Sequence, residues 1–477
     1  MENMRQKVFT GFIWRFMERI GAQGVSFIVS LILARLLTPE DYGQVALITV
    51  FITILNTFAT SGIGTALIQK KNADDTDFST VFYFNILFSL ALYALLFLCA
   101  PFIGRFYNDM SLVPIIRVLG TTIVVSAVNN VQQSYVSKTM QFRRFFFSTL
   151  IGTVFSGIVG VVFAYKGFGT WAIVVQQLVN QIANTAILWI TVKWRPIKAF
   201  SLFRLKVLYS FGWKLLFSSL IDTVYNNIYS LVIGKFYDAN TLGLYNKGVQ
   251  FPNLIINNVN GPIQSVLLPA MSYEQNNTKR IKEMVRRSIK TSTYLIFPLM
   301  IGMAAVARPM VILLLTEKWV ACVPFLQISC ITLAVYPIHT ANLQAINALG
   351  RSDIFLKLEI IKKIVGLTLL IVGIPFGVYA MVWLKGLSSL ISTFINAFPN
   401  RKLLDYSYWE QIKDLTPSIG ISAVMGISVL AVELLQLNVV VTLVMQIVIG
   451  VIIYVGLSKL LKLECFSYIV NVIMKGK

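Results

Sequence analysis

The sequence has 477 residues, of which 56% are hydrophobic and only 13% are charged. Soluble domains carry about a quarter charged residues, so this composition excludes a soluble globular protein and indicates a chain that crosses a membrane many times. The net charge of +21 does not indicate nucleic-acid binding, because no soluble basic domain is present to carry it. An excess of Lys and Arg is instead typical of the cytoplasmic loops of membrane proteins.

Runs of about 20 mainly apolar residues, the length that crosses a bilayer as a helix, recur along the whole chain. We therefore expect an all-α polytopic membrane protein with about fourteen transmembrane helices. In chain order, the predicted spans are 11–37, 42–68, 78–104, 112–136, 145–166, 170–192, 207–234, 241–270, 288–315, 320–348, 355–375, 376–398, 416–435 and 438–460.

Basic residues gather on alternate connections between these spans. With a cytoplasmic N-terminus, clusters such as Arg143–Arg144 and Arg286–Arg287 all fall on the cytoplasmic side. The opposite loops, for example "TPED" and "YDAN", are short and carry few basic residues. This asymmetry follows the positive-inside rule and predicts that both termini are cytoplasmic.

Motifs for catalysis or nucleotide binding are not found. The sequence contains no G-x-x-x-x-G-K-[ST], H-E-x-x-H or G-x-S-x-G pattern, and its four cysteines have neither paired nor metal-type spacing. We therefore expect no catalytic residue, no metal site and no cofactor. The single histidine, His339, is expected to be a packed polar residue rather than a ligand.

The chain contains weak internal repeats. Trp14-Arg15 aligns with Trp213-Lys214, and Gly43 aligns with Gly243 at nearly the same offset. Two further pairs are "LVPIIRVLG" with "CVPFLQISC" and "FGTWA" with "FGVYA". Repeated halves are typical of secondary transporters. We predict an N-terminal lobe at 1–200, a C-terminal lobe at 201–400, and two additional helices with a cytoplasmic tail at 401–477.

A few charged side chains fall inside the predicted spans, where each costs roughly 2.5–3.5 kcal/mol even on the mildest scale. Such residues normally face a protein interior or a water-filled cavity, and arginine forks match phosphate oxygens. Candidate residues for binding a diphosphate are Arg15, Arg19, Lys214, Arg117, Lys247 and Lys385, and candidates for ion coupling are Asp222 and Glu18.

Other interpretations of these residues remain open. Arg15, Lys214 and Lys385 could lie near helix ends and extend their charge to the interface. Asp222 could carry a proton or sodium ion, or could be the structural partner of a lysine. Several spans also carry Asn and Gln residues, among them Asn130 and Gln181, which could bind sugar hydroxyls or form hydrogen bonds between helices.

Segments in both halves of the N-terminal lobe resemble a known family. "ILARLLTPEDYGQVAL", after a first span with Trp-Arg, resembles the polysaccharide exporters of the multidrug/oligosaccharidyl-lipid/polysaccharide flippase superfamily. "NNVQQSYVSKTMQFRRF" and "GFGTWAIVVQQL" are similar to the teichuronic-acid and colanic-acid type within it. The resemblance covers essentially the whole chain, and these motifs are more specific for the superfamily than for the sugar.

The resemblance implies two lobes around a central cavity with alternating access. It implies a flippase for an undecaprenyl-diphosphate-linked oligosaccharide in the bacterial inner (plasma) membrane, in polysaccharide biosynthesis of the lipopolysaccharide kind. Family members place basic residues in the cavity, and Arg15, Arg19 and Lys214 occupy matching positions. The implied partners are the lipid-linked oligosaccharide and the bilayer, with a polysaccharide polymerase and glycosyltransferases as candidate protein partners.

Two other functions compete with this prediction. A cation-coupled multidrug exporter of the same superfamily should have an acidic lumen for its usually cationic substrates, whereas the charges inside these spans are mainly basic. A membrane polysaccharide polymerase or ligase needs an outer loop that holds catalytic groups, and the outer loops here are only a few residues long. A scaffold would leave the intramembrane charges unexplained.

Overall fold

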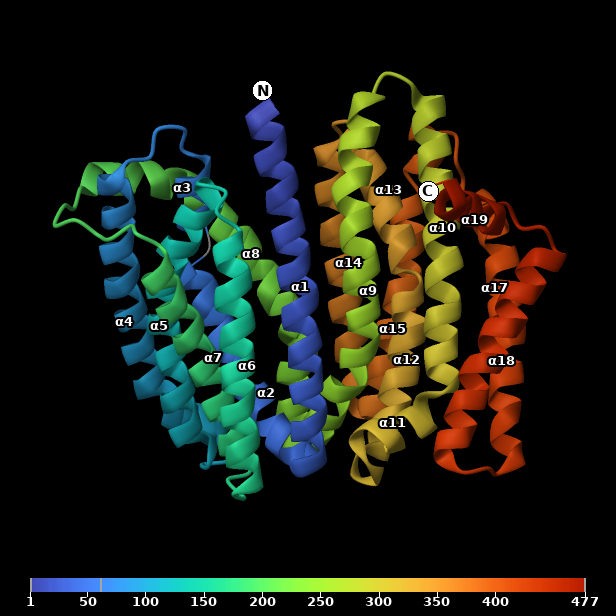
Figure 1. Ribbon diagram of the computed structural model, residues 1–477, viewed down its shortest axis with the longest axis horizontal. Coiled ribbons are helices and arrows are strands. Elements are labelled where there is room, and N and C mark those ends of the chain that lie inside the picture. Colours follow the sequence, from blue (N-terminus) through green and yellow to red (C-terminus); the bar gives the residue numbers. More distant parts are fainter. Residues whose placement is uncertain (1, 61, 476–477) are drawn as a thin grey trace. The chain divides into compact units, whose positions relative to one another are not determined.

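The computed structural model describes residues 2–60 and 62–475, and these residues form helices without any β-strand (Figure 1). The predicted all-α class is therefore confirmed. The outermost residues of the two termini, which the sequence places in the cytoplasm, lie outside the described residues.

The chain forms two compact units, 1–243 and 244–477. The lobe boundaries expected from the internal repeat, at 200 and 400, are a different division of the chain and stay a prediction. The first unit contains α1 (Glu2–Leu36), α2 (Pro39–Thr60), α3 (Ile63–Gln69), α4 (Asp75–Phe106), α5 (Leu112–Lys138), α6 (Arg143–Tyr165), α7 (Thr170–Thr191) and α8 (Leu202–Phe236).

Helix α9 (Ala239–Tyr273) begins in the first unit and continues in the second. The second unit then contains α10 (Thr278–Ala305), α11 (Ala307–Leu315), η1 (Glu317–Cys322), α12 (Val323–Ala334), α13 (Tyr336–Ala348), α14 (Ser352–Gly373), η2 (Ile374–Phe376), α15 (Val378–Ala397), α16 (Asn400–Leu403), α17 (Tyr408–Ala431), η3 (Val432–Leu435), α18 (Val439–Leu460) and α19 (Glu464–Lys475).

Each of the predicted spans falls on one of these helices or on a consecutive group of them. Among the described residues, ten helical segments are long and apolar enough to cross a membrane, or up to eleven if the bent pair α10–α11 counts as one span. The other predicted spans fall on α8, α9 and α14, which are long but do not meet this test. The protein is thus a multi-pass membrane protein, and the number fourteen stays a prediction.

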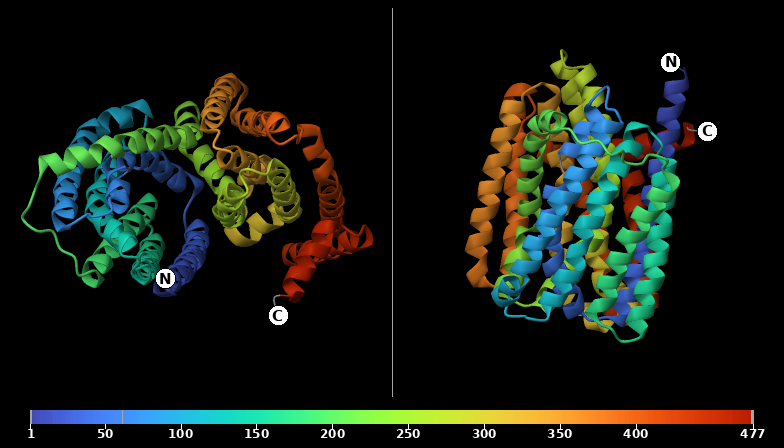
Figure 2. Two further views of the ribbon diagram at one scale, coloured as in Figure 1. Left: turned by 90° about the horizontal axis from the view of Figure 1, so that it is seen from above. Right: turned by 90° about the vertical axis from the view of Figure 1, so that its left-hand side faces the viewer.

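Within the first unit, α1 packs on α6, α6 on α7, α4 on α5, and α2 on both α5 and α8 (Figure 2). A cluster of buried side chains joins several of these helices to the segment that precedes α8. It contains Leu67, Phe78, Phe82, Leu188 and Trp194. Because the cluster combines side chains from several helices and from the segment before α8, it holds these parts of the first unit together.

The predicted span 42–68 is divided into α2 and α3. Gly62 has φ +86°, a left-handed conformation that is favourable only for glycine, and it lies between the two helices. At the break, the Asn130 side chain donates a hydrogen bond from Nδ2 to the carbonyl oxygen of Thr60 at 3.3 Å. One amide of α5 therefore satisfies a backbone group that the interruption leaves without a helical partner.

Within the second unit, α10 packs on α12 and α17, α12 on α15, and α17 on α18 (Figure 1). The additional C-terminal helices are joined to α10 through Tyr294, whose hydroxyl donates to Ser458 Oγ at 2.9 Å. The Tyr454 hydroxyl donates in return to the carbonyl oxygen of Tyr294 at 2.6 Å. The α10–α11 pair bends by 70°, so the predicted span 288–315 is not one straight helix.

Large apolar side chains are exposed over long stretches of the helices. On α18, Val444, Ile447, Val451 and Ile452 are all exposed. In water, an apolar surface of this extent would favour aggregation. In a bilayer it contacts lipid, which agrees with the membrane-spanning helices described above.

Candidate functional site

Arg15 on α1 lies against the start of α6. Its Nη1 forms an ion pair with Glu18 Oε2 at 2.9 Å, and its guanidinium lies 4.1 Å from the Phe145 ring centroid and 5.0 Å from that of Phe142. Thr149 donates a hydrogen bond from Oγ1 to Glu18 Oε1 at 3.1 Å. The helical spacing of Arg15 and Glu18 predicts their contact, whereas the aromatic partners come from tertiary packing.

The guanidinium of Arg15 is held in place by Glu18 and the two rings but is partly exposed. Its side chain is 44% exposed, so the guanidinium retains donors that point away from Glu18 and the rings. Stacking on an aromatic face stabilises a guanidinium by about 0.5–2 kcal/mol and leaves its edge available. An arginine held in this way can bind a phosphate with less loss of side-chain entropy than a mobile one.

Arg19 lies one helical turn after Arg15 on α1 and is exposed. Lys214 and Asp222 lie on α8, and both are exposed. The structure thus places Arg15, Arg19, Lys214 and Asp222 on α1 and α8 with accessible side chains. Neither the ligand role of Arg19 and Lys214 nor the coupling role of Asp222 follows from exposure alone, and both stay predictions.

Arg117 has a more enclosed environment. Its guanidinium carbon lies 4.2 Å from the Phe97 ring centroid, and its carbonyl oxygen accepts a hydrogen bond from the Tyr93 hydroxyl at 3.1 Å. Among the described residues, Arg117 Nε is buried without a hydrogen-bond partner. Its guanidinium is therefore stabilised mainly by the face of an aromatic ring of α4.

In the second unit, two predicted lysines lie beside aromatic side chains. Lys385 donates a hydrogen bond from Nζ to the Tyr245 hydroxyl at 2.9 Å. Lys247 is only 3% exposed, and its Nζ lies 5.8 Å from the Trp319 ring centroid. In this conformation the Lys247 amine is not available to a large ligand, so a role in binding requires that the packing around it opens.

Tyr245 is a residue that the sequence did not single out. It is 4% exposed, its ring packs edge-on against Phe325 at 5.9 Å, and Phe325 stacks on Tyr379 at 4.9 Å. A tyrosine in an apolar helix gives no sequence signal for this role, because only the fold brings α9 and α15 together at this point.

Some of the Asn and Gln residues in and near the spans form hydrogen bonds between helices, whereas Asn227 and Asn258 donate within their own helices. Gln181 donates from Nε2 to Ser126 Oγ at 3.0 Å. In the second unit, Asn342 donates to Gln411 Oε1 at 2.9 Å and accepts from Asn400 Nδ2 at 2.7 Å. These contacts support a structural role for these particular amides and leave the binding of sugar hydroxyls as a prediction for others.

His339 belongs to the same polar interior. One ring nitrogen lies 3.0 Å from Asn396 Nδ2, and the other lies 3.4 Å from the hydroxyls of Ser389 and Thr393. The histidine is therefore packed against amide and hydroxyl groups, as predicted from the sequence. No group of three or more His, Cys, Asp or Glu side chains in the described residues is arranged to hold a metal ion.

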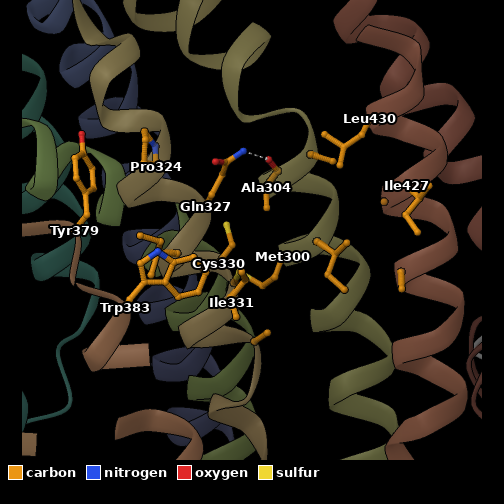
Figure 3. A pocket seen from close by; sticks show the side chains of 16 residues that line it. Met300, Ala304, Pro324, Gln327, Cys330, Ile331, Tyr379, Trp383, Ile427 and Leu430 are labelled. Atoms are coloured by element: carbon orange, nitrogen blue, oxygen red, sulfur yellow. Dashed lines mark hydrogen bonds between the residues drawn. The ribbon is translucent and has the colours of Figure 1, made fainter. Parts of the chain in front are cut away.

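An apolar cavity of about 660 Å³ lies between α10, α12, α15 and α17 (Figure 3). Among its lining residues, the Gln327 amide donates from Nε2 to the carbonyl oxygen of Ala304 at 3.1 Å, so one of its two N–H donors is already used. Such a wall suits a hydrocarbon chain better than a sugar or a phosphate. The lining includes Met300, Ile331, Tyr379, Trp383, Ile427 and Leu430.

Comparison with solved structures relates the fold to known transporters. The lipid II flippase MurJ in an inward closed conformation superimposes with a TM-score of 0.72 over 95% of this chain and 98% of that chain, at 16% identity. An inward-facing multidrug resistance MATE family transporter superimposes with a TM-score of 0.65 over 80% of this chain and 94% of that chain, at 16% identity. At these identities the likeness concerns the fold.

Comparison of sequences relates the chain to polysaccharide biosynthesis. It is 23% identical over 437 residues to the teichuronic acid biosynthesis protein TuaB of Bacillus subtilis, covering 91% of this chain and 90% of that protein. It is also 23% identical over 442 residues to the lipopolysaccharide biosynthesis protein WzxC of Escherichia coli, covering 89% of each. Residues 32–324 match the family model described as "Polysaccharide biosynthesis protein", and the chain belongs to this family.

Proposed function

We propose that this protein flips an undecaprenyl-diphosphate-linked oligosaccharide from the inner to the outer leaflet of a bacterial plasma membrane by alternating access. The observation that carries the proposal is the similarity of nearly the whole chain both to the fold of a lipid II flippase and to proteins named for polysaccharide biosynthesis. In this proposal the two repeated halves, 1–200 and 201–400, are the lobes, and both termini are cytoplasmic.

The charge of the membrane helices supports an anionic head group. Arg15, Arg19 and Lys214 are exposed cations within predicted spans, and a cationic surface in a low-dielectric wall attracts an anion. Arg15 fits this role best, because Glu18 and two phenylalanines hold its guanidinium while part of it stays exposed. A diphosphate can then use the donors that the internal ion pair leaves available.

A multidrug exporter is the nearest competing function, since a MATE transporter shares the fold. The fold is common to both functions, and the charges favour the flippase. A site for organic cations calls for acidic or aromatic groups, whereas Glu18, one of the two predicted acidic residues, already pairs with Arg15. A polysaccharide polymerase or ligase has less support, because short connections such as 107–111 and 166–169 leave little room for a catalytic loop.

Reconstitution tests the proposal directly. The full-length protein in liposomes should transfer a fluorescent lipid-linked oligosaccharide between leaflets, measured by a membrane-impermeant quencher. Arg15→Ala, Arg19→Ala and Lys214→Ala should each lower the rate by about tenfold, the effect of one lost charge-assisted hydrogen bond of ~1.4 kcal/mol or more.

The matched control is Lys71→Ala, which removes an exposed cation from the connection between α3 and α4. This variant should transfer the lipid at the wild-type rate. Equal rates in all four variants would contradict the assignment of the cations. Transport of a cationic dye without any transfer of the lipid would favour the multidrug exporter.

A further inference from the structure

The connection between α7 and α8, residues 192–201, contains no helix, yet it is tightly held by the first unit. We call these residues the strap. Trp194 anchors the strap: it is 6% exposed, and its ring lies 5.8 Å from that of Phe78 and 6.1 Å from that of Tyr135. Its indole nitrogen donates to Asp75 Oδ1 at 3.1 Å, so both the apolar ring and its polar atom have partners.

The backbone of the strap is satisfied by side chains of α4 and α5. Ser79 Oγ accepts from the backbone N–H of Ile197 at 2.9 Å, and Thr80 Oγ1 accepts from that of Ser201 at 3.2 Å. Gln132 donates from Nε2 to the carbonyl oxygen of Trp194 at 3.2 Å. The backbone N–H and C=O groups of a connecting segment usually form hydrogen bonds with water. Here buried side chains of the neighbouring helices form these hydrogen bonds instead.

The strap is also closed at both of its ends. At the first end, Arg195 donates to the carbonyl oxygen of Trp189 in α7 and, within the strap, to those of Val192 at 2.6 Å and Trp194 at 2.7 Å. At the second end, Arg204, in the first turn of α8, forms ion pairs with Asp74 and with Asp77, the latter at 3.3 Å.

The ion pair between Arg204 and Asp77 at the second end differs from a surface ion pair, because Asp77 is buried. Its side chain is fully buried, and it also accepts from Lys70 Nζ at 2.6 Å. Loss of Arg204 would leave this buried carboxylate with Lys70 as its remaining basic partner among the described residues, and weakening the pairing of a buried charge costs more than an exposed pair contributes. The first turn of α8 is thus bound to the start of α4 by ion pairs, and breaking the pair that involves buried Asp77 costs free energy.

We propose that the strap and Arg204 act as a clamp that keeps the beginning of α8 fixed on α4 during transport. The boundary between the two repeats predicted at 1–200 and 201–400 lies in the strap. A flexible connection at this point would let the whole of α8 move relative to α4. With the clamp closed, any reorientation of α8 is confined to residues after Arg204. The proposal rests on the proposed function only in assuming a transport cycle.

Hydrogen exchange tests whether the clamp exists, without any transport assay. In the full-length protein, the backbone amides of Ile197 and Ser201 should exchange more slowly than those of an open loop. Ser79→Ala should accelerate exchange of the Ile197 amide by about fivefold, as expected for one lost hydrogen bond. Ser89→Ala is the matched control, because this buried hydroxyl on the same helix donates to Ile86 in its own helix and does not contact the strap.

Cross-linking tests whether the clamp stays closed. In a variant without the native cysteines, Ser79→Cys with Ile197→Cys should form a disulfide on mild oxidation. Ser89→Cys with Ile197→Cys should not, because Ser89 lies about 15 Å further along α4. The oxidised Ser79–Ile197 variant should transfer the lipid-linked oligosaccharide within twofold of its rate after reduction.

The two measurements separate the clamp from the proposed function. Transfer that disappears on oxidation and returns on reduction would show that the strap must leave α4, which overturns the clamp. Loop-like exchange of the strap amides in the wild-type protein overturns it as well. Wild-type protein that transfers no lipid would instead refute the proposed function, while exchange and disulfide yield still decide whether the strap is fixed.

Discussion

Gly43 and Gly243 occupy reciprocal positions where the first turns of α2 and α9 touch. A Cβ atom on Gly43 would lie 1.6 Å from the carbonyl oxygen of Ala239, and one on Gly243 would lie 1.8 Å from that of Pro39. These two glycines are also equivalent in the internal repeat of the sequence. Each helix therefore needs its glycine for the same reason, namely that the backbone of the other occupies the space of a side chain.

Gly43→Ala should destabilise the protein, because the added methyl group cannot fit without displacing the backbone of α9. Overpacking of this kind costs about 1–3 kcal/mol, and the apparent melting temperature in detergent should fall accordingly. Gly24→Ala is the control, since no atom lies within 4 Å of the new methyl group and alanine favours the helix. A melting temperature that is the same for both variants would contradict the close approach of the two helices.

Tyr245→Phe should weaken the attachment of α15 to α9. The substitution keeps the ring that packs on Phe325 and removes the oxygen that accepts from Lys385, which costs about 1–3 kcal/mol where the donor is left partly buried. The unfolding midpoint should fall more than in Tyr379→Phe, where stacking on Phe325 persists. If the two variants unfold alike, the Lys385 hydrogen bond contributes nothing measurable.

Gln411→Leu should loosen the additional C-terminal helices, because Asn342 and Asn400 in the interior lose part of their hydrogen-bonding network. A buried amide without a partner costs about 1–3 kcal/mol. Limited proteolysis should then cut the connection between α16 and α17 faster than in the wild-type protein. The control is Gln275→Leu at an exposed position after α9, and equal cleavage of both variants would refute the structural role of the network.

The ion pairs at the start of α4 should make stability depend on pH in the acid range. The hydrogen bond from Arg204 and the backbone N–H of Asp77 lower the pKa of the Asp74 carboxyl. Since the folded pKa lies below the unfolded value of about 3.9, this contribution is present above pH 4 and is lost as the pH falls through the folded pKa.

Measured between pH 6 and pH 3, the melting temperature of Asp74→Asn should therefore fall less steeply than that of the wild-type protein. Glu40→Gln, a change at an exposed position at the start of α2, should leave the wild-type slope unchanged. A slope that is identical in Asp74→Asn and the wild-type protein would show that the pair does not couple to folding.

Some predicted residues could be understood from the sequence because their partners are local. The ion pair of Arg15 and Glu18 follows from a spacing of three residues on a helix. The packed character of His339 follows from its isolation in an apolar span. The phenylalanines that hold Arg15, by contrast, lie more than a hundred residues away at the start of α6, and no local pattern connects them with α1.

Lys247 and Lys385 also show that the surroundings of a charged residue cannot be predicted from its sequence neighbours alone. In the sequence both are single cations in apolar spans, and the two look alike. In the structure one amine is buried beside Trp319, and the other bonds to a tyrosine hydroxyl. Their surroundings differ because side chains from α9, η1 and α15 meet there, which depends on helix packing rather than on the neighbours in sequence.

The sequence by itself determined the membrane class, the helical secondary structure and the approximate position of the long helices, because these depend on apolar length and charge that can be counted along the chain. Only the tertiary structure decided where a span is broken, which cation is covered by an aromatic ring, and that the α7–α8 connection is fixed rather than free. Those properties arise from contacts between residues far apart in the chain, and the free energy of such contacts is not contained in any local pattern.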